Sequence, residues 1–234
     1  MQDYIRIKSK SNPNLELKVI PGHFASDRFH VNYYIEMSSL KMRQTDAKMV
    51  AHAMADKYID KLDVNETLTG LINPSLLNTA ISAQKIDTIV CMDGCEVIGA
   101  YLADELSKVG VETTNKHGCF YVITPEFDNT GQMVVRNNIK KMINGKNVLV
   151  VLASAMSGRT ISKAIGTIKA FNGKIAGLSV IFGNVDEIEG HKVYKVFGTE
   201  DLPDFKLSSP TDCEACKEGI KLDAVVNSYG YEEL

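Results

Sequence analysis

The sequence predicts an α/β fold in which a mostly parallel, twisted sheet is flanked by helices. Its clearest element is the unbroken apolar run at 148–151, which is typical of a strand buried on both faces of a parallel sheet. Strand and helix patterns alternate through the middle of the chain, as they do when helices cover both sides of a sheet. The length of 234 residues suits a single domain, residues 1–234, with a small additional lobe.

Short extended segments open the chain, and helical patterns follow them. Strict alternation and β-branched or aromatic runs indicate strands, while Pro-Gly pairs indicate turns. Hydroxyl side chains and proline at the beginning of apolar periodicity indicate helix starts. We expect, in order, a strand at 15–19, a turn at Pro21 and Gly22, a strand at 31–35, a helix from Ser38 or Ser39 to about Tyr58, and a helix over 74–84.

The middle and end of the chain read as strand–helix units. Polar residues at 125–132 predict a mobile loop or a hairpin tip between two such units. The expected elements are strands at 87–91, 111–114, 120–124, 148–151 and 174–182, helices at 97–106 and 160–168, and a possible edge strand at 192–197.

The segment after the buried strand is a candidate phosphate site. A strand, a loop of small residues and a helix follow one another, which leaves backbone N–H groups and the positive end of a helix dipole at the loop. A plain strand-to-helix turn has the same outline, so both interpretations stay open. The candidate phosphate-binding residues are Ser154, Ala155, Met156, Ser157, Gly158, Arg159 and Thr160.

A second loop follows the strand at 87–91. Ligands of open parallel sheets bind at the carboxyl ends of the strands, where both loops are expected. The residues of this second loop are Met92, Asp93, Gly94, Cys95 and Glu96. Cys95 also lies near a predicted helix N-terminus, which can activate a thiol, although a buried, inert cysteine is the simpler interpretation.

Composition excludes several classes of protein. The net charge of −3 gives no sign of a nucleic-acid surface, and no apolar run approaches the length of a membrane span. The five cysteines are an odd number, and the first residues do not resemble an export signal. We therefore expect reduced thiols and a cytoplasmic protein.

Cys213 and Cys216 have the spacing of half a zinc site or of a redox pair. No second Cys-x-x-Cys motif accompanies them, and nothing in the sequence fixes the spacing of further ligands. A local turn that carries two unrelated thiols is the simpler interpretation, so the sequence assigns no metal ligands.

Taken together, four segments resemble the type I phosphoribosyltransferases, and orotate phosphoribosyltransferase most of all. The segments 22–24 with 30–36, 89–103 and 148–160 resemble the hood, the pyrophosphate loop and the phosphoribosyl-pyrophosphate motif of that family, and 201–205 with 212–219 resembles tail motifs of some members. The resemblance implies the type I phosphoribosyltransferase fold. A small hood would be formed by about residues 1–37 and part of the tail at 200–234.

The resemblance also implies an activity. Members transfer ribose 5-phosphate from phosphoribosyl pyrophosphate to a nitrogenous base with Mg²⁺, here a pyrimidine or a related base. Residues 92–96 would form the pyrophosphate loop, and the base pocket would include His30, Asn32 and Tyr33. Family members are typically homodimers, so the resemblance implies a homodimer.

The chain departs from the family at the charged residues of two motifs. The two acidic residues of the family motif fall on Leu152 and Ala153, which can bind neither ribose hydroxyls nor a metal. The segment matching the family's basic mobile loop, 123–132, contains Glu126 and Asp128 but no Lys or Arg. No catalytic residue is assigned.

Two hypotheses follow from these matches and departures. The first is an orotate phosphoribosyltransferase-like enzyme that uses phosphoribosyl pyrophosphate and Mg²⁺. The second is a catalytically impaired paralogue that binds a nucleotide or sugar 5′-phosphate as a sensor or regulator. The retained residues 157–160 support phosphate binding in both, while the missing acids favour the second.

Overall fold

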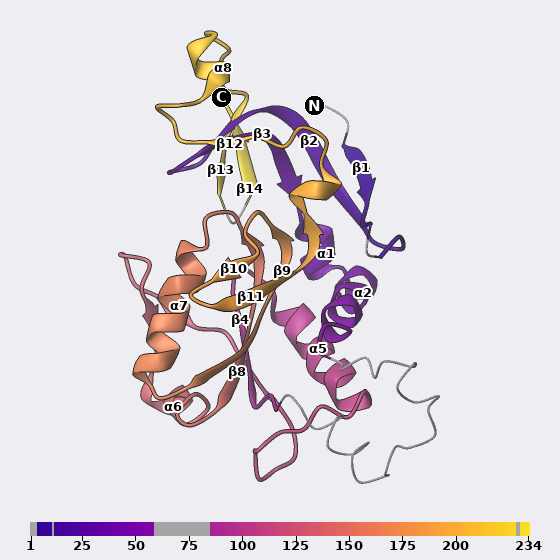
Figure 1. Ribbon diagram of the computed structural model, residues 1–234, viewed down its shortest axis with the longest axis vertical. Helices are drawn as coiled ribbons and strands as arrows, with labels where there is room; N and C mark the ends of the chain where they lie inside the picture. The colour runs from indigo at the N-terminus through magenta and orange to yellow at the C-terminus, as the bar shows by residue number, and fades with distance from the viewer. Residues whose placement is uncertain (1–3, 11, 59–84, 228–229) are drawn as a thin grey trace.

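The computed structural model describes residues 4–10, 12–58, 85–227 and 230–234. These residues form two six-stranded sheets and a short hairpin (Figure 1). The predicted helix over 74–84 lies outside the described residues. Within the described part of the chain, no helix is both long and apolar enough to cross a membrane.

The core sheet confirms the predicted α/β fold. Its strand order is β10-β11-β9-β8-β4-β5, and every neighbouring pair is parallel except β10 with β11. The strands are β4 (Thr88–Cys91), β5 (Tyr121–Ile123), β8 (Asn147–Ala155), β9 (Lys174–Gly183), β10 (Glu187–Ile188) and β11 (His191–Gly198).

Helices cover both faces of the core sheet because the side chains of its central strand alternate between them. Leu149, Val151 and Ala153 of β8 pack in the core beneath α2 and α5, and Val150 and Leu152 pack beneath α7. Figure 1 shows α7 and α2 on opposite sides of the sheet. The helices are α1 (Ser38–Met42), α2 (Gln44–Ala55), α5 (Glu96–Lys108), α6 (Asn137–Lys140) and α7 (Arg159–Ala170).

The second sheet, which we call the hood, combines the two ends of the chain. Its main strand order is β12-β3-β2-β13-β14, and β1 pairs with β2. Figure 1 shows it above the core sheet, near both termini. The strands are β1 (Ile5–Lys8), β2 (Glu16–Ala25), β3 (His30–Glu36), β12 (Leu207–Ser208), β13 (Ala224–Asn227) and β14 (Gly230–Glu233), with η1 (Thr199–Asp201) and α8 (Glu214–Lys217) in the tail.

The predicted turn at Pro21 and Gly22 is wrong, because β2 continues through both residues. The pairing of β2 with β3 shifts register between Pro21 and Phe24, and such a bulge accommodates a proline that cannot donate to the ladder. A Cβ atom at Gly22 would lie 2.6 Å from Asp223 Oδ2, so the glycine permits a close approach of the tail.

Three other local predictions need correction. The helix expected up to Tyr58 is interrupted at Arg43, whose ψ of 120° is extended, and neither Ser38 nor Ser39 is its N-cap. Residues 111–114 are not a strand, since their polar groups bond to a buried carboxylate instead of to a neighbouring strand. The strand predicted at 192–197 is β11, which pairs on both sides and is not the sheet edge.

Candidate functional site

A cavity of about 890 Å³ lies between the hood and the core sheet, at the carboxyl ends of β4 and β8. Its walls come from segments far apart in the sequence. The hood contributes the β2–β3 turn at 25–29 and residues of β3, β13 and β14, whereas the core contributes Asp93 and the loop at 153–161. This is the edge at which ligands of open parallel sheets bind.

The loop after β8 has the geometry of an anion site. Two hydrogen bonds from Asn184 fix the backbone of this loop: its N–H donates to Ala155 O at 2.9 Å, and its Nδ2 donates to Met156 O. Gly158 then adopts a φ of 73° and serves as the N-cap of α7. The first turn of α7 has N–H groups without intrahelical acceptors, so partial positive charge gathers at the loop.

All seven residues that the sequence nominates for phosphate binding line this cavity. Ser157, Arg159 and Thr160 are exposed, while Ala155 and Gly158 are buried. The exposed hydroxyls can donate to a phosphate oxygen, and the guanidinium can pair with its charge. The loop therefore presents backbone and side-chain donors together.

Cations outnumber acids around the cavity. Its described lining includes Arg28, Lys41, Arg159 and Lys163, against Asp27, Glu36 and Asp93. Lys41 is buried, and its Nζ donates to the Asp93 carbonyl oxygen at 3.0 Å. With the positive end of α7 added, the cavity favours an anionic ligand.

The second predicted loop contributes one residue to the cavity. Asp93 lines it, with φ of 54°, and burial raises the pKa of its carboxyl although Lys41 opposes the shift. Met92 and Cys95 are instead packed in the core, and Glu96 is exposed and accepts from Thr124. Burial raises the pKa of the Cys95 thiol, which fits an inert, buried cysteine.

The three residues proposed for a base pocket separate in the structure. Tyr33 lines the cavity, and its hydroxyl donates to Pro203 O at 3.1 Å. Asn32 is not among the lining residues, because its side chain bonds to the backbone of Asp204 and Lys206 and fastens the tail to β3. His30 points to a different cluster, which is described below.

The two positions that are acidic in the family motif are apolar structural positions here. Leu152 is fully buried beneath α7, and Ala153 lines the cavity with a methyl group. Neither supplies a hydrogen-bond acceptor to the ligand side of the loop.

The polar segment at 125–132 forms a hairpin between β6 (Glu126–Phe127) and β7 (Met133–Val134). Arg136 pairs with Glu126 at 2.6 Å, and Asp128 accepts bonds from the backbone of Thr130 and Gln132. Lys163 of α7 donates to Thr130 O at 2.6 Å. Glu126 and Asp128 are therefore engaged with Arg136 or within the hairpin.

Comparisons with known proteins give structural likeness only. No family model matches the chain, and no curated protein matches its sequence. Similar solved structures include UMP synthase of Leishmania donovani, with 15% identity, a TM-score of 0.44, and 73% of this chain and 31% of that chain covered. The chain thus spans about a third of that protein.

Two further solved structures cover more of their own chains. A phosphoribosyltransferase of Corynebacterium diphtheriae shows 12% identity and a TM-score of 0.43, with 79% of this chain and 90% of that chain covered. Adenine phosphoribosyltransferase of Trypanosoma brucei shows 14% identity and a TM-score of 0.48, with 78% of each chain covered. The site must therefore be interpreted from its own geometry.

Sequence reasoning missed four lining residues that matter for a charged ligand. Lys163 follows Arg159 by four residues on α7, so helical spacing could have placed both on one face. Arg28 and Phe29 lie in the β2–β3 turn, whereas the sequence pattern places the turn before the strand at 31–35 at Pro21 and Gly22. Lys41 carries no such signal, because its burial beside Asp93 depends on the packing of α1 against α5.

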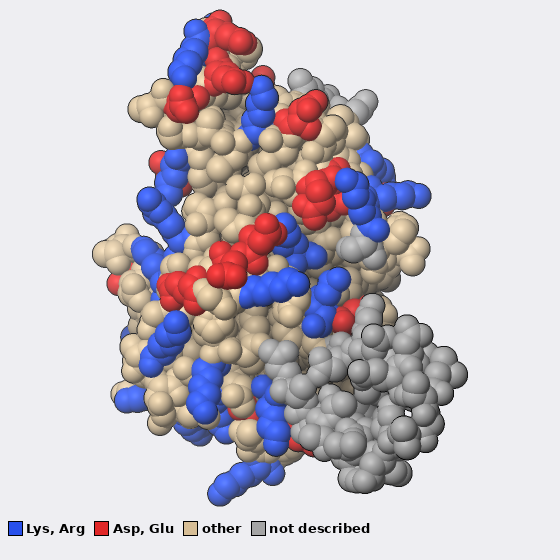
Figure 2. All heavy atoms as spheres, viewed as in Figure 1, with Lys and Arg blue, Asp and Glu red and all other residues tan. Residues whose placement is uncertain are grey.

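Charge elsewhere is mixed. On the face of the molecule in Figure 2, Lys and Arg side chains are interspersed with Asp and Glu, and neither sign forms a continuous field.

Proposed function

We propose that the cavity binds the 5′-phosphate of a nucleotide or of a ribose phosphate. The observation that carries this proposal is the convergence of the α7 N-terminus with Lys41, Arg159 and Lys163 on one cavity; its fourth cation, Arg28, pairs with Asp27 at 2.9 Å. The phosphate would be bound by the N–H groups and hydroxyls of 157–160. A volume of about 890 Å³ is within the range of small-molecule sites and accommodates a nucleotide.

The hood side of the cavity offers two aromatic rings. Phe29 and Tyr33 both line the cavity there. Their aromatic rings can stack on a base. We propose a pyrimidine or a related base as the occupant of this side.

We propose that the protein acts as a sensor or regulator in this binding role. Leu152 and Ala153 leave the phosphate loop without carboxylates for ribose hydroxyls. Electrostatic stabilisation of the departing pyrophosphate usually dominates catalysis of phosphoribosyl transfer. A site without that stabilisation can still bind a monophosphate.

An orotate-type phosphoribosyltransferase is the second candidate, and Glu36 and Asp93 favour it. Both carboxylates line the cavity, on the hood and on the second loop. They are residues that could hold Mg²⁺ together with substrate phosphates, because Mg²⁺ sites commonly use one or two carboxylates and phosphate oxygens. In such a reaction the protein would position the base against the ribose carbon and neutralise the leaving group.

One pair of measurements separates the two candidates. Thermal unfolding is measured with uridine 5′-monophosphate, uridine and phosphoribosyl pyrophosphate, with and without Mg²⁺, and pyrophosphate release is assayed over a panel of bases. A sensor is stabilised by the monophosphate and not by uridine, gains nothing from Mg²⁺ and releases no pyrophosphate. Base-dependent pyrophosphate release would establish the transferase instead, and no stabilisation by any phosphate would refute the site.

Arg159→Ala tests the phosphate side directly. Losing a charge-assisted bond costs about 1.5–3 kcal/mol, so affinity for uridine 5′-monophosphate should fall on the order of tenfold to a hundredfold. Lys169→Ala is the matched control, since Lys169 is a cation at the other end of α7 and does not line the cavity. Calorimetric titration measures both, and equal affinities in the two variants would contradict the placement of the phosphate.

We also propose that the protein is a homodimer, as the resemblance implies, and that it is cytoplasmic, as the composition indicates. None of the five cysteines is in a disulfide, which supports a reducing compartment. Light scattering during size-exclusion chromatography should give twice the chain mass, and a monomer mass would contradict the assembly.

A further inference from the structure

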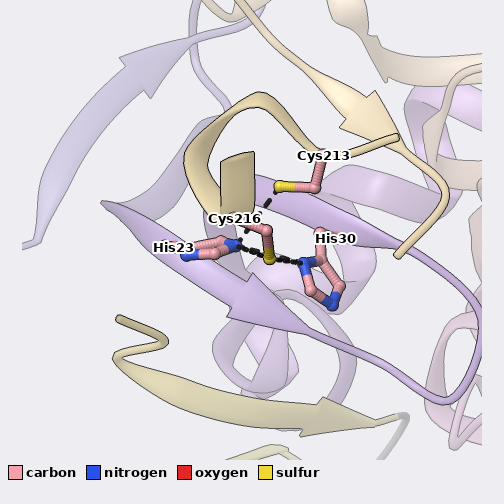
Figure 3. Close-up of side chains that lie close together, drawn as sticks. All are labelled: His23, His30, Cys213 and Cys216. Atoms are coloured by element: carbon pink, nitrogen blue, oxygen red, sulfur yellow. Dashed lines mark hydrogen bonds between the residues drawn. The ribbon is translucent and has the colours of Figure 1, made fainter. Parts of the chain in front are cut away.

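Four side chains that the cavity does not use converge in the hood (Figure 3). His23 comes from β2 and His30 from β3, while Cys213 and Cys216 flank the start of α8. One ligating atom of each lies within 4.8 Å of the others, and His23, His30 and Cys213 are buried. The two pairs are about 190 residues apart in sequence, so the spacing could not reveal the cluster.

Four of the six distances between the ligating atoms are close to those of a tetrahedral site. Tetrahedral zinc with Zn–N of about 2.05 Å and Zn–S of about 2.3 Å separates two nitrogens by about 3.3 Å and a nitrogen from a sulfur by about 3.6 Å. Here His23 Nε2 lies 3.1 Å from His30 Nδ1 and 3.3 Å from Cys213 Sγ. Cys216 Sγ lies 3.7 Å from His23 Nε2 and 3.4 Å from His30 Nδ1.

A backbone carbonyl outside the cluster orients the ring of His23. Its Nδ1 lies 3.1 Å from the carbonyl oxygen of Ile220, which can only accept, so Nδ1 carries the proton of a neutral ring. Nε2 faces the two sulfur atoms (Figure 3), and its lone pair is then available to a metal ion. A backbone carbonyl on the far nitrogen is the usual outer partner of a metal-binding histidine.

We propose that His23, His30, Cys213 and Cys216 bind one zinc ion. Two thiolates and two imidazoles are a donor set that favours zinc over the hard cations Mg²⁺ and Ca²⁺, which prefer oxygen. Four protein ligands complete a tetrahedral shell and leave no position for a reacting water, so the ion is structural.

The zinc ion fixes two walls of the cavity, and this consequence rests on the proposed function. His23 and His30 flank the β2–β3 turn, whose residues Ser26–Phe29 line the cavity. The two cysteines precede β13, and Asn227 at its end also lines the cavity. The ion therefore joins the tail to the hood turn on the side where the base is proposed to bind.

Metal analysis of the purified full-length chain tests the site. The protein is prepared under reducing conditions, and zinc is measured by plasma mass spectrometry. We expect one zinc per chain in the wild type, less than a tenth of that in the double variant Cys213→Ser/Cys216→Ser, and full occupancy in Cys119→Ser. Cys119 is an exposed free cysteine outside the cluster, so it is the matched control.

A second measurement on the wild type keeps the test decisive if the double variant fails to fold. Zinc is removed with a chelator, and Co²⁺ is added in its place. Tetrahedral ligand-field bands with a thiolate-to-cobalt charge-transfer band, displaced by Zn²⁺, are the expected result. Wild-type protein that holds no zinc and gives no such bands, or in which Cys213 and Cys216 form a disulfide under reducing conditions, would overturn the proposal.

The readout is independent of nucleotide binding. Full zinc occupancy without any stabilisation by uridine 5′-monophosphate would refute the proposed function and leave the metal site intact. Nucleotide binding by a wild type that holds no zinc would refute the metal site and leave the proposed function intact.

Discussion

Gly158→Val should abolish binding of uridine 5′-monophosphate, with a loss of affinity on the order of a hundredfold or more. Gly158 has a φ of 73°, which a β-branched residue adopts only at a cost of about 1–3 kcal/mol. A Cβ atom there would also lie 2.8 Å from Ile188 Cδ1. The loop must therefore move, and the N–H groups at the start of α7 move with it.

Gly166→Ala is the control for this variant because it changes a glycine in the same helix. Gly166 lies inside α7, and a Cβ atom there would meet nothing within 4 Å. Alanine in a helix interior is favoured over glycine by about 1 kcal/mol, so this variant should be slightly more stable and bind normally. Calorimetric titration and thermal unfolding are measured for both. Unchanged nucleotide affinity in Gly158→Val would show that the loop is not the phosphate site.

The second large effect concerns stability, at the buried carboxylate of Asp87. Its Oδ1 accepts hydrogen bonds from Thr113 Oγ1 and Thr114 N, and its Oδ2 accepts from Asn147 N and Asn147 Nδ2. All four donor–acceptor distances are 2.9 Å or less. The carboxylate thereby joins the starts of β4 and β8 to the segment that leads to β5. Asp87→Ala leaves buried donors without acceptors and should lower the free energy of unfolding by about 4 kcal/mol.

Denaturant unfolding measures this loss, and Asp104→Ala is its control. Asp104 is an exposed residue of α5 that pairs with Lys108, and such surface pairs contribute about 0–1 kcal/mol. Equal stabilities of the two variants would show that the Asp87 network does not hold the strands together.

The same carboxylate gives the stability a defined pH dependence. Burial opposes ionisation, but bonds from Asn147, Thr114 and Thr113 outweigh it and lower the pKa of Asp87. A folded-state pKa below the unfolded value of about 3.9 means that the unfolded chain binds the proton first as pH falls. This stabilisation is complete above about pH 4 and is lost as pH falls through the folded-state pKa. Asp87→Ala should lack that part of the acid sensitivity; an identical acid profile in wild type and variant would contradict it.

The elements of the core sheet could be predicted because local pattern and burial agree there. Val148–Val151 is apolar at every position, and β8 is buried on both faces. Prediction failed where tertiary contacts override local signals. Pro21 and Gly22 read as a turn, yet a bulge in a strand paired on both sides accommodates them. The break at Arg43 has no counterpart in the sequence pattern.

The phosphate loop could be nominated from sequence because all of its residues are contiguous. The rest of the cavity is built from segments that are far apart in the sequence. Lys41 lies beside Asp93, and the hood turn at 25–29 lines the same cavity as the loop at 154–160, but neither pair is close in sequence. The four proposed zinc ligands show the same dependence on distant segments. Cys213 and Cys216 were visible as half a site, whereas His23 and His30 join them only through the pairing of β2 with β3 and the return of the tail.

A crystal structure with bound uridine 5′-monophosphate tests the central claim most directly. The account predicts the phosphate at the N-terminus of α7, within hydrogen-bond distance of N–H groups of 157–160, with the base toward Phe29 and Tyr33. A nucleotide bound elsewhere, or a phosphate that contacts neither the loop nor Arg159, would contradict it.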